Sequence, residues 1–209
     1  ATTHLKTTVA NDTAEAVEVE LVQTILDAGG TEVGTVTTPV TVEADASKTV
    51  EANAAVTSYK LWDLSNNPAL YTARTEVTVA GEVVDTYDTT FGYRYTSYDA
   101  NGFLLNGKRI KLQGVSMHHD QGSLGSVSTR DAIERQVAIL KDMGVNAIRA
   151  THNPYAQEFI DVCNENGMLV IEEFFDGWNA PKNGNTYDYS RFFAQTIGET
   201  ELINASADM

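Results

Sequence analysis

The sequence predicts a multidomain chain of β plus α/β class. An immunoglobulin-like β-sandwich is expected over residues 1–95, followed over residues 96–209 by the N-terminal part of a (β/α)8 TIM barrel. In the first half apolar and polar residues alternate, which is the two-residue period of half-buried strands. In the second half a helical pattern, a glycine and a short apolar strand follow one another twice, which is typical of repeated βα units.

Composition narrows the classes of protein and partner. A length of 209 residues is enough for two domains, and 42% hydrophobic residues support a packed core. The formal net charge of -15 repels phosphate backbones, so nucleic acid is not an expected partner. No apolar run approaches the ~20 residues of a membrane-spanning helix, so no membrane partner is expected either. Cys163 is the only cysteine, which excludes an internal disulfide and leaves the redox compartment open.

The two ends of the chain favour a piece of a longer protein. The sequence starts at Ala1 with neither an initiator methionine nor a signal peptide, and it stops at Met209 within a helical pattern. Cytoplasm, secretion and the cell surface are all open as localisations.

The first half carries the strand pattern of a sandwich. Val17, Val19 and Leu21 alternate with Glu18 and Glu20, and Gly-, Asn- and Pro-containing turns separate such runs. About seven short strands are expected, held by apolar packing alone. Acidic residues are scattered along the solvent faces, so this half is expected to be a support domain without chemistry.

The second half begins with a hairpin and a first βα unit. Gly102 to Lys108 forms the hairpin, with Asn106-Gly107 as a type I′ turn, and the first barrel strand follows at Arg109. Ser128 or Thr129 caps the first helix and Gly144 ends it. The inward face of this helix is expected to hold the following residues: Ile133, Val137, Leu140 and Met143.

Two further units follow. Asn153 caps the second helix with Pro154 at its first position, and Gly167 ends it. The inward side chains of this helix are Phe159, Ile160 and Cys163, and residues 189–207 supply a third helix. A complete barrel takes about 250 residues, so its remainder lies beyond Met209.

Polar clusters follow each barrel strand. The groups are His118-His119-Asp120, His152-Asn153, and Glu172-Glu173 with Asp176 and Trp178. Taken singly, each histidine fits an ordinary solvated loop. Because the carboxyl ends of parallel strands share one rim, where barrel enzymes carry their sites, the clusters together predict a functional site.

The residue types favour a sugar ligand. Trp178 offers a flat apolar face to a sugar ring, and His, Asn and Asp side chains exchange hydrogen bonds with hydroxyls. Arg149 is expected to be buried in its strand and to face a carboxylate across the barrel. Glu172 and Glu173 point to opposite faces, so they cannot be the paired carboxylates of a glycosidase. No metal-binding motif such as HExxH is present.

Several phrases resemble a known family. They are Leu61-Trp62, Asn67-Pro68-Ala69-Leu70-Tyr71, Phe91-Gly92-Tyr93-Arg94, residues 102–108, residues 111–115, Asn146-Ala147-Ile148-Arg149, His152-Asn153-Pro154 and residues 172–178. In this order they are similar to the central part of a glycoside hydrolase of family 2, in the bacterial β-galactosidase group. The resemblance covers essentially the whole chain.

The resemblance implies a retaining glycosidase acting on terminal β-D-galactosides. Its acid/base and nucleophile glutamates would both lie beyond Met209, so the chain alone is expected to be inactive. By resemblance, His118 and His152 contact the sugar, and Arg149 orients the nucleophile. The further rim contacts would be Asp120, Asn153, Glu173 and Trp178. Some relatives bind magnesium, but the glutamate-plus-histidine pattern after strand three is absent here, so no metal or cofactor is predicted.

Alternatives remain. β-Glucuronidase and β-mannosidase share the architecture, and a non-catalytic glycan-binding or adhesion module would need no glutamates downstream. The expected partners are a β-galactoside or oligosaccharide substrate and the missing remainder of the barrel. Since an incomplete barrel leaves an open strand edge, the isolated piece is expected either to self-associate through that edge or to be disordered near its C-terminus.

Overall fold

A computed structural model describes residues 1–173. The chain divides into two compact units, which are described separately. The first contains Ala1–Asp63 and Asn67–Ile110, and the second contains Leu64–Asn66 and the chain from Lys111 on. The domain boundary between residues 95 and 96 stays a prediction. No helix in residues 1–173 is both long and apolar enough to cross a membrane.

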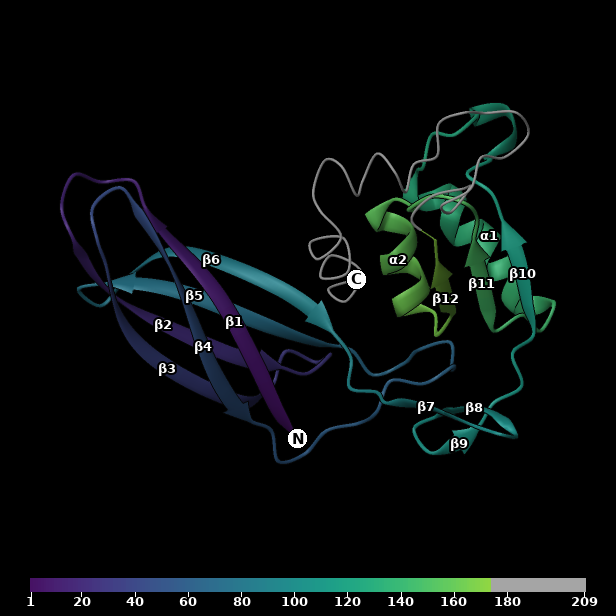
Figure 1. The fold of residues 1–209 in the computed structure, drawn as a ribbon, viewed down its shortest axis with the longest axis horizontal. Coiled ribbons are helices and arrows are strands. Elements are labelled where there is room, and N and C mark those ends of the chain that lie inside the picture. Colours follow the sequence, from purple (N-terminus) through teal and green to yellow (C-terminus); the bar gives the residue numbers. More distant parts are fainter. Residues whose placement is uncertain (174–209) are drawn as a thin grey trace. The chain divides into compact units, whose positions relative to one another are not determined.

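A β-sandwich makes up most of the first unit (Figure 1). Its strands are β1 (Thr2–Asn11), β2 (Val17–Leu26), β3 (Glu32–Val42), β4 (Ala46–Ala55), β5 (Tyr71–Val79) and β6 (Glu82–Phe91). β1 and β4 form one antiparallel sheet, and the other sheet has the order β3-β2-β5-β6. The immunoglobulin-like prediction is confirmed, although the strands are six and long rather than about seven and short.

Apolar packing holds the two sheets together. Along β2 the side chains of Val19, Leu21 and Ile25 are buried while Glu18 and Glu20 are exposed, as the two-residue period predicts. The buried residues form two clusters, one around Leu21 and Val42 and the other around Ile25 with an aromatic group next to it. That group joins Tyr71, Phe91 and Tyr93, whose ring centroids lie 5.0–6.0 Å apart.

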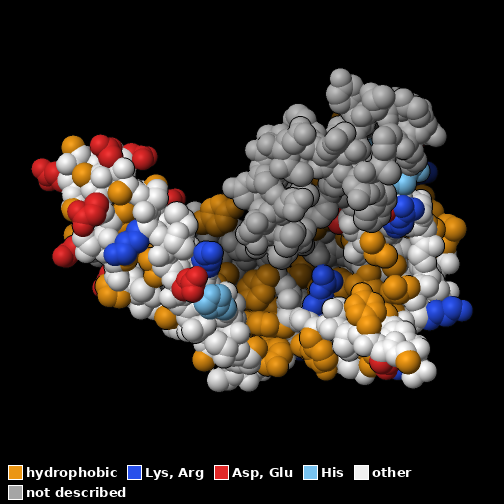
Figure 2. Space-filling model, in the orientation of Figure 1, with side chains coloured by type: hydrophobic (Ala, Val, Ile, Leu, Met, Phe, Trp, Pro, Cys, Tyr) orange, Lys and Arg blue, Asp and Glu red, His pale blue; other side chains and the backbone are white. Residues whose placement is uncertain are grey.

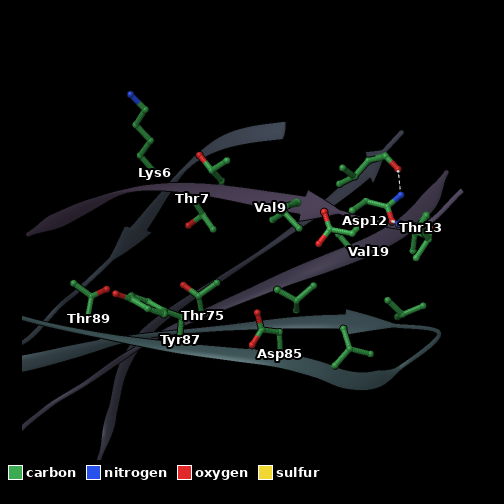
Figure 3. A pocket seen from close by; sticks show the side chains of 18 residues that line it. Lys6, Thr7, Val9, Asp12, Thr13, Val19, Thr75, Asp85, Tyr87 and Thr89 are labelled. Atoms are coloured by element: carbon green, nitrogen blue, oxygen red, sulfur yellow. Dashed lines mark hydrogen bonds between the residues drawn. The ribbon is translucent and has the colours of Figure 1, made fainter. Parts of the chain in front are cut away.

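One side of the sandwich is open between β1 and the β5–β6 pair. A groove of about 780 Å³ runs there, and Figure 3 shows Thr7 and Val9 of β1 across from Thr75 and Tyr87 of the other sheet. Buried Gln23 ties the two sheets beside it, since its Nε2 group donates to the hydroxyls of Thr7 (2.9 Å) and Thr75 (3.4 Å). A buried amide therefore stays hydrogen-bonded in an otherwise apolar core.

Acidic residues occupy the surface of the sandwich. Figure 2 shows them gathered at the end that carries the turns between β1 and β2, between β3 and β4, and between β5 and β6. Asp12, Glu43 and Asp45 are among the exposed residues of these turns. The acidic residues thus lie on solvent-exposed positions, as predicted, but they are concentrated at these turns as well as scattered along the strands.

A small antiparallel ribbon follows the sandwich. It contains β7 (Thr96–Asp99), β8 (Gly102–Leu105) and β9 (Lys108–Arg109). Asn106 and Gly107 have φ of 53° and 74°, as the predicted type I′ turn requires. Arg109 closes this ribbon, and its hydrogen bonds to Asp99 lower the pKa of that carboxyl to about 2. The expectation that a barrel strand starts at Arg109 is therefore wrong.

The second unit is the beginning of a βα barrel. Its elements are β10 (Gly114–Met117), a 3-10 turn (Gly122–Leu124), α1 (Arg130–Asp142), β11 (Ala147–Ala150), α2 (Gln157–Glu165) and β12 (Leu169–Glu172). The strands are parallel and lie in the order β10-β11-β12. Ile133, Val137, Phe159 and Cys163 of the two helices pack against Ile148 of β11, so both helices cover the same face of the sheet.

The ends of the helices differ in part from the predictions. Thr129 is the N-cap of α1 without a side-chain hydrogen bond, and α2 starts after Ala156, so Asn153 and Pro154 precede the helix rather than begin it. Met143 is 69% exposed, because it lies at the C-cap of α1 and not on its inward face. The predicted helix stops at Gly144 and Gly167 are supported by their φ of 83° and 61°. The predicted third helix over residues 189–207 lies outside the described residues.

Candidate functional site

The polar clusters predicted after the three barrel strands lie together. His118 follows the end of β10, His152 follows β11 and Glu173 follows β12, at the carboxyl ends of neighbouring parallel strands. The rings of His118 and His152 meet edge to face, with centroids 5.5 Å apart and an angle of 75°. Two imidazoles from loops 34 positions apart in the sequence thus share one site.

A carboxylate joins the second and third strand ends. Arg149 Nε donates to Glu173 Oε1 at 2.7 Å, and His152 Nδ1 lies 3.0 Å from Glu173 Oε2. The side chain of Arg149 is 45% exposed, so the prediction of a buried arginine with its partner across the barrel is wrong. Arg149 pairs in register with Ile171, and Glu173 lies two residues further on the same face, so the partner comes from the neighbouring strand.

The negative charge of Glu173 is balanced by the positive charge of Arg149. Partial burial disfavours the ionised form of Glu173, but hydrogen bonds from Arg149 and His152 outweigh it and hold the pKa of Glu173 below its usual value. The carboxylate is therefore ionised at neutral pH beside a permanent cation. The remaining N–H groups of Arg149 and the two histidine rings can exchange hydrogen bonds with a hydroxylated ligand.

Glu172 points away from Glu173, as their adjacent positions in a strand predict. Its Oε1 accepts the backbone N–H of Tyr155 at 2.7 Å, and its Oε2 is buried with no hydrogen-bond partner among the described residues. Burial, reinforced by the charge of Glu172, raises the pKa of Tyr155 to about 12. The two glutamates hold opposite ends of the segment from His152 to Tyr155, so together they position the loop.

A second network lies beside the first. Asn153 Nδ2 lies 3.2 Å from His119 Nδ1, while the other ring nitrogen of His119 lies 3.2 Å from Ser128 Oγ. The ring of His119 also packs on Tyr155 at 4.3 Å. His119 was predicted to lie in the first cluster, without a role. Ser128 was predicted only as a possible helix cap and Tyr155 was not predicted, because nothing in their local sequence marks them as neighbours of His119.

The remaining predicted site residues fall in different places. Asp120 Oδ1 accepts the backbone N–H of Gly122 at 2.8 Å, so this carboxylate closes the turn of its own loop. Asp176 and Trp178 lie outside the described residues. Among residues 1–173 no three His, Cys, Asp or Glu side chains form a group that could hold a metal ion.

Comparison with family models decides the classification. Residues 1–94 match the model described as glycosyl hydrolases family 2, and residues 98–196 match its TIM barrel domain. The chain belongs to glycoside hydrolase family 2. The β-galactosidase BoGH2A of Bacteroides ovatus is 40% identical over 191 residues, which cover 91% of this chain and 22% of that protein. A β-glucuronidase of Streptococcus agalactiae is 35% identical over 138 residues, covering 61% of this chain and 23% of that protein.

Solved structures agree with this classification. A family 2 member from Bacteroides cellulosilyticus has a TM-score of 0.83 at 33% identity, covering 93% of this chain and 25% of the other. A β-glucuronidase of Bacteroides uniformis has a TM-score of 0.77 at 30% identity, covering 83% of this chain and 21% of the other. The family 2 chain thus spans about a quarter or less of the length of these relatives, in the part that joins the immunoglobulin-like domain to the start of the barrel.

Proposed function

We propose that this family 2 chain is part of a retaining glycosidase that cleaves terminal β-D-galactosides. In this proposal the chain supplies the start of the sugar-binding rim, through His118, His152 and Arg149, and both catalytic glutamates lie beyond Met209. The observation that carries the proposal is the meeting of these side chains at the carboxyl ends of β10 and β11.

The charge of the rim favours a neutral sugar. A glucuronide carries a carboxylate that needs an unmatched cation, whereas Arg149 is already paired with Glu173. Relatives called β-glucuronidase nevertheless make glucuronide the second candidate, and they share this stretch of the chain at 35% identity in the S. agalactiae protein. The β-galactosidase of B. ovatus is similar over more of the chain, which supports galactose as the first candidate.

The test is a substrate panel on the full-length parent protein. Chromogenic β-galactoside, β-glucuronide and β-mannoside are compared at equal concentration, and the highest kcat/KM is expected for the galactoside. A preference for the glucuronide or the mannoside would replace the galactosidase proposal with the corresponding activity. Sugar binding without hydrolysis of any of the three would favour a non-catalytic glycan-binding module.

A further inference from the structure

We propose that Glu173 is a positioning residue, which fixes Arg149 and His152 and does not itself bind the sugar. The proposal rests on the proposed function where it concerns the sugar, but its structural part stands without it. It departs from the expectation that Glu173 is one more contact on the rim.

Both oxygens of the carboxylate are already engaged. Oε1 accepts from Arg149 Nε and Oε2 faces His152 Nδ1, at 2.7 and 3.0 Å. The side chain of Glu173 is 19% exposed, against 45% for Arg149 and 35% for His152. The carboxylate is therefore the most enclosed member of the group, and its two partners are the members that present surface to a ligand.

The contact with Arg149 determines which edge of the guanidinium remains available. Glu173 occupies the Nε position, and the two terminal nitrogens make no hydrogen bond within residues 1–173. Arg149, Ser116 and Ile171 share one register layer of the sheet and are exposed, whereas Ile148 of the same strand packs against the helices. The edge of the guanidinium that carries these two nitrogens thus lies on the face of the sheet that α1 and α2 do not cover.

The contact with His152 determines its tautomer. A carboxylate accepts only, so the short contact places a proton on Nδ1 and leaves Nε2 to interact with a ligand. The edge-to-face contact with His118 restricts the ring further. Because Glu172 holds the backbone of Tyr155, the loop that carries His152 is fixed from both ends.

Whether Glu173 fixes His152 can be tested in the 209-residue chain without any sugar, by measuring which ring nitrogen of His152 carries the proton. In Glu173→Gln one of the two oxygens becomes an NH2 group, so the side chain can no longer accept from both partners. Long-range 1H–15N spectra of the four histidines are expected to show His152 with its proton on Nδ1 in the native chain and to lose that preference in the variant. Glu165→Gln, which removes another glutamate paired with an arginine, is the matched control and should leave His152 unchanged.

Unchanged His152 signals in a folded Glu173→Gln chain would overturn the proposal. Should that variant unfold, Glu173→Asp keeps the charge but shortens the side chain by one methylene, so it cannot reach both partners, and it is read in the same way. The outcome does not depend on hydrolysis, so failure of the glycosidase proposal and failure of this one are distinguishable.

Kinetics of the full-length parent separate positioning from sugar contact. Misplacing Arg149 and His152 is expected to lower kcat on the order of 10- to 100-fold with a much smaller change in KM. A raised KM with kcat retained would instead show that Glu173 contacts the substrate in the ground state, and would contradict the proposal.

Discussion

At the residue scale, the site depends on side chains that parallel pairing brings to one rim. His118 and His152 meet because β10 and β11 are neighbours, and Glu173 reaches both Arg149 and His152 because β12 lies next to β11. Asp120 is close to His118 in sequence, but its carboxylate accepts a hydrogen bond from the backbone of its own loop. The type of a residue and its position after a strand therefore indicate a candidate for the site. Its role depends on the hydrogen-bond partner that the folded chain gives it.

Removing an imidazole should weaken catalysis by the parent protein. His152→Ala is expected to lower kcat/KM by about 10²–10³, because a preorganised group that supports the transition state is lost. Steady-state kinetics on the preferred glycoside measure the effect. His4→Ala is the control, since the side chain of His4 is 59% exposed on β1 of the sandwich and its removal should leave the rate unchanged. Equal rates for both variants would contradict a role for His152.

The single thiol should make stability depend on alkaline pH. Burial, with a contribution from the charge of Glu172, raises the pKa of Cys163 to about 12, whereas an unfolded thiol ionises near ~8.5. Between these values the native state binds one more proton, so the free energy of unfolding falls as pH rises. Urea unfolding at pH 8 and pH 10 should show a steeper loss for the native chain than for Cys163→Ala. Parallel losses would show that Cys163 does not contribute.

At the scale of elements, glycine correctly predicted where a helix ends, whereas the Asn-Pro pair did not predict where the second helix begins. Gly144 ends α1 as predicted, because its positive φ suits the left-handed position after a helix. Asn153 and Pro154 looked like a cap and a first helical residue, yet Asn153 instead contacts His119 and the helix starts at Gln157. A side chain used in the site is not available as a cap, and local sequence does not show which use applies.

Replacing the glycine after α1 should destabilise the second unit. At Gly144 a methyl group would meet no atom within 4 Å, so the cost of Gly144→Ala arises from its φ of 83° alone. We expect about 1 kcal/mol of lost unfolding free energy, measured by urea denaturation. Gly144→Asn is the matched control at the same open position and should cost less, because asparagine adopts the left-handed region more readily than alanine.

At the scale of the whole molecule, the sandwich and the barrel segment differ in how completely they bury their apolar surface. The sandwich has two packed sheets, whereas the parallel sheet of residues 114–172 has helices on one face and free edges at β10 and β12 within the described residues. Ile171 is 53% exposed on the other face. A sheet with unpaired edges can pair with another chain.

The 209-residue chain is therefore expected to self-associate. Light scattering over a range of concentrations should give an apparent mass that rises with concentration, while a longer parent protein that completed the barrel should lack this edge-dependent rise. A monodisperse 209-residue monomer with an ordered β12 would contradict the prediction. The same preparation is expected to show no turnover of a chromogenic β-galactoside, since the catalytic glutamates would lie beyond it.

Periodicity and strand-end composition alone determined the fold class, the order of the βα units and the convergence of His118, His152 and Glu173. These features can be predicted because the side-chain period of a strand or helix is set by residues close in sequence. Repeated βα units also place the carboxyl ends of their parallel strands on one side of the sheet. Only the tertiary structure decided that Arg149 is exposed and paired with Glu173, that His119 joins Asn153 and Ser128, and that Asp120 turns into its own loop. Hydrogen-bond partners depend on distances between separate strands and loops, which exist only once the chain has folded.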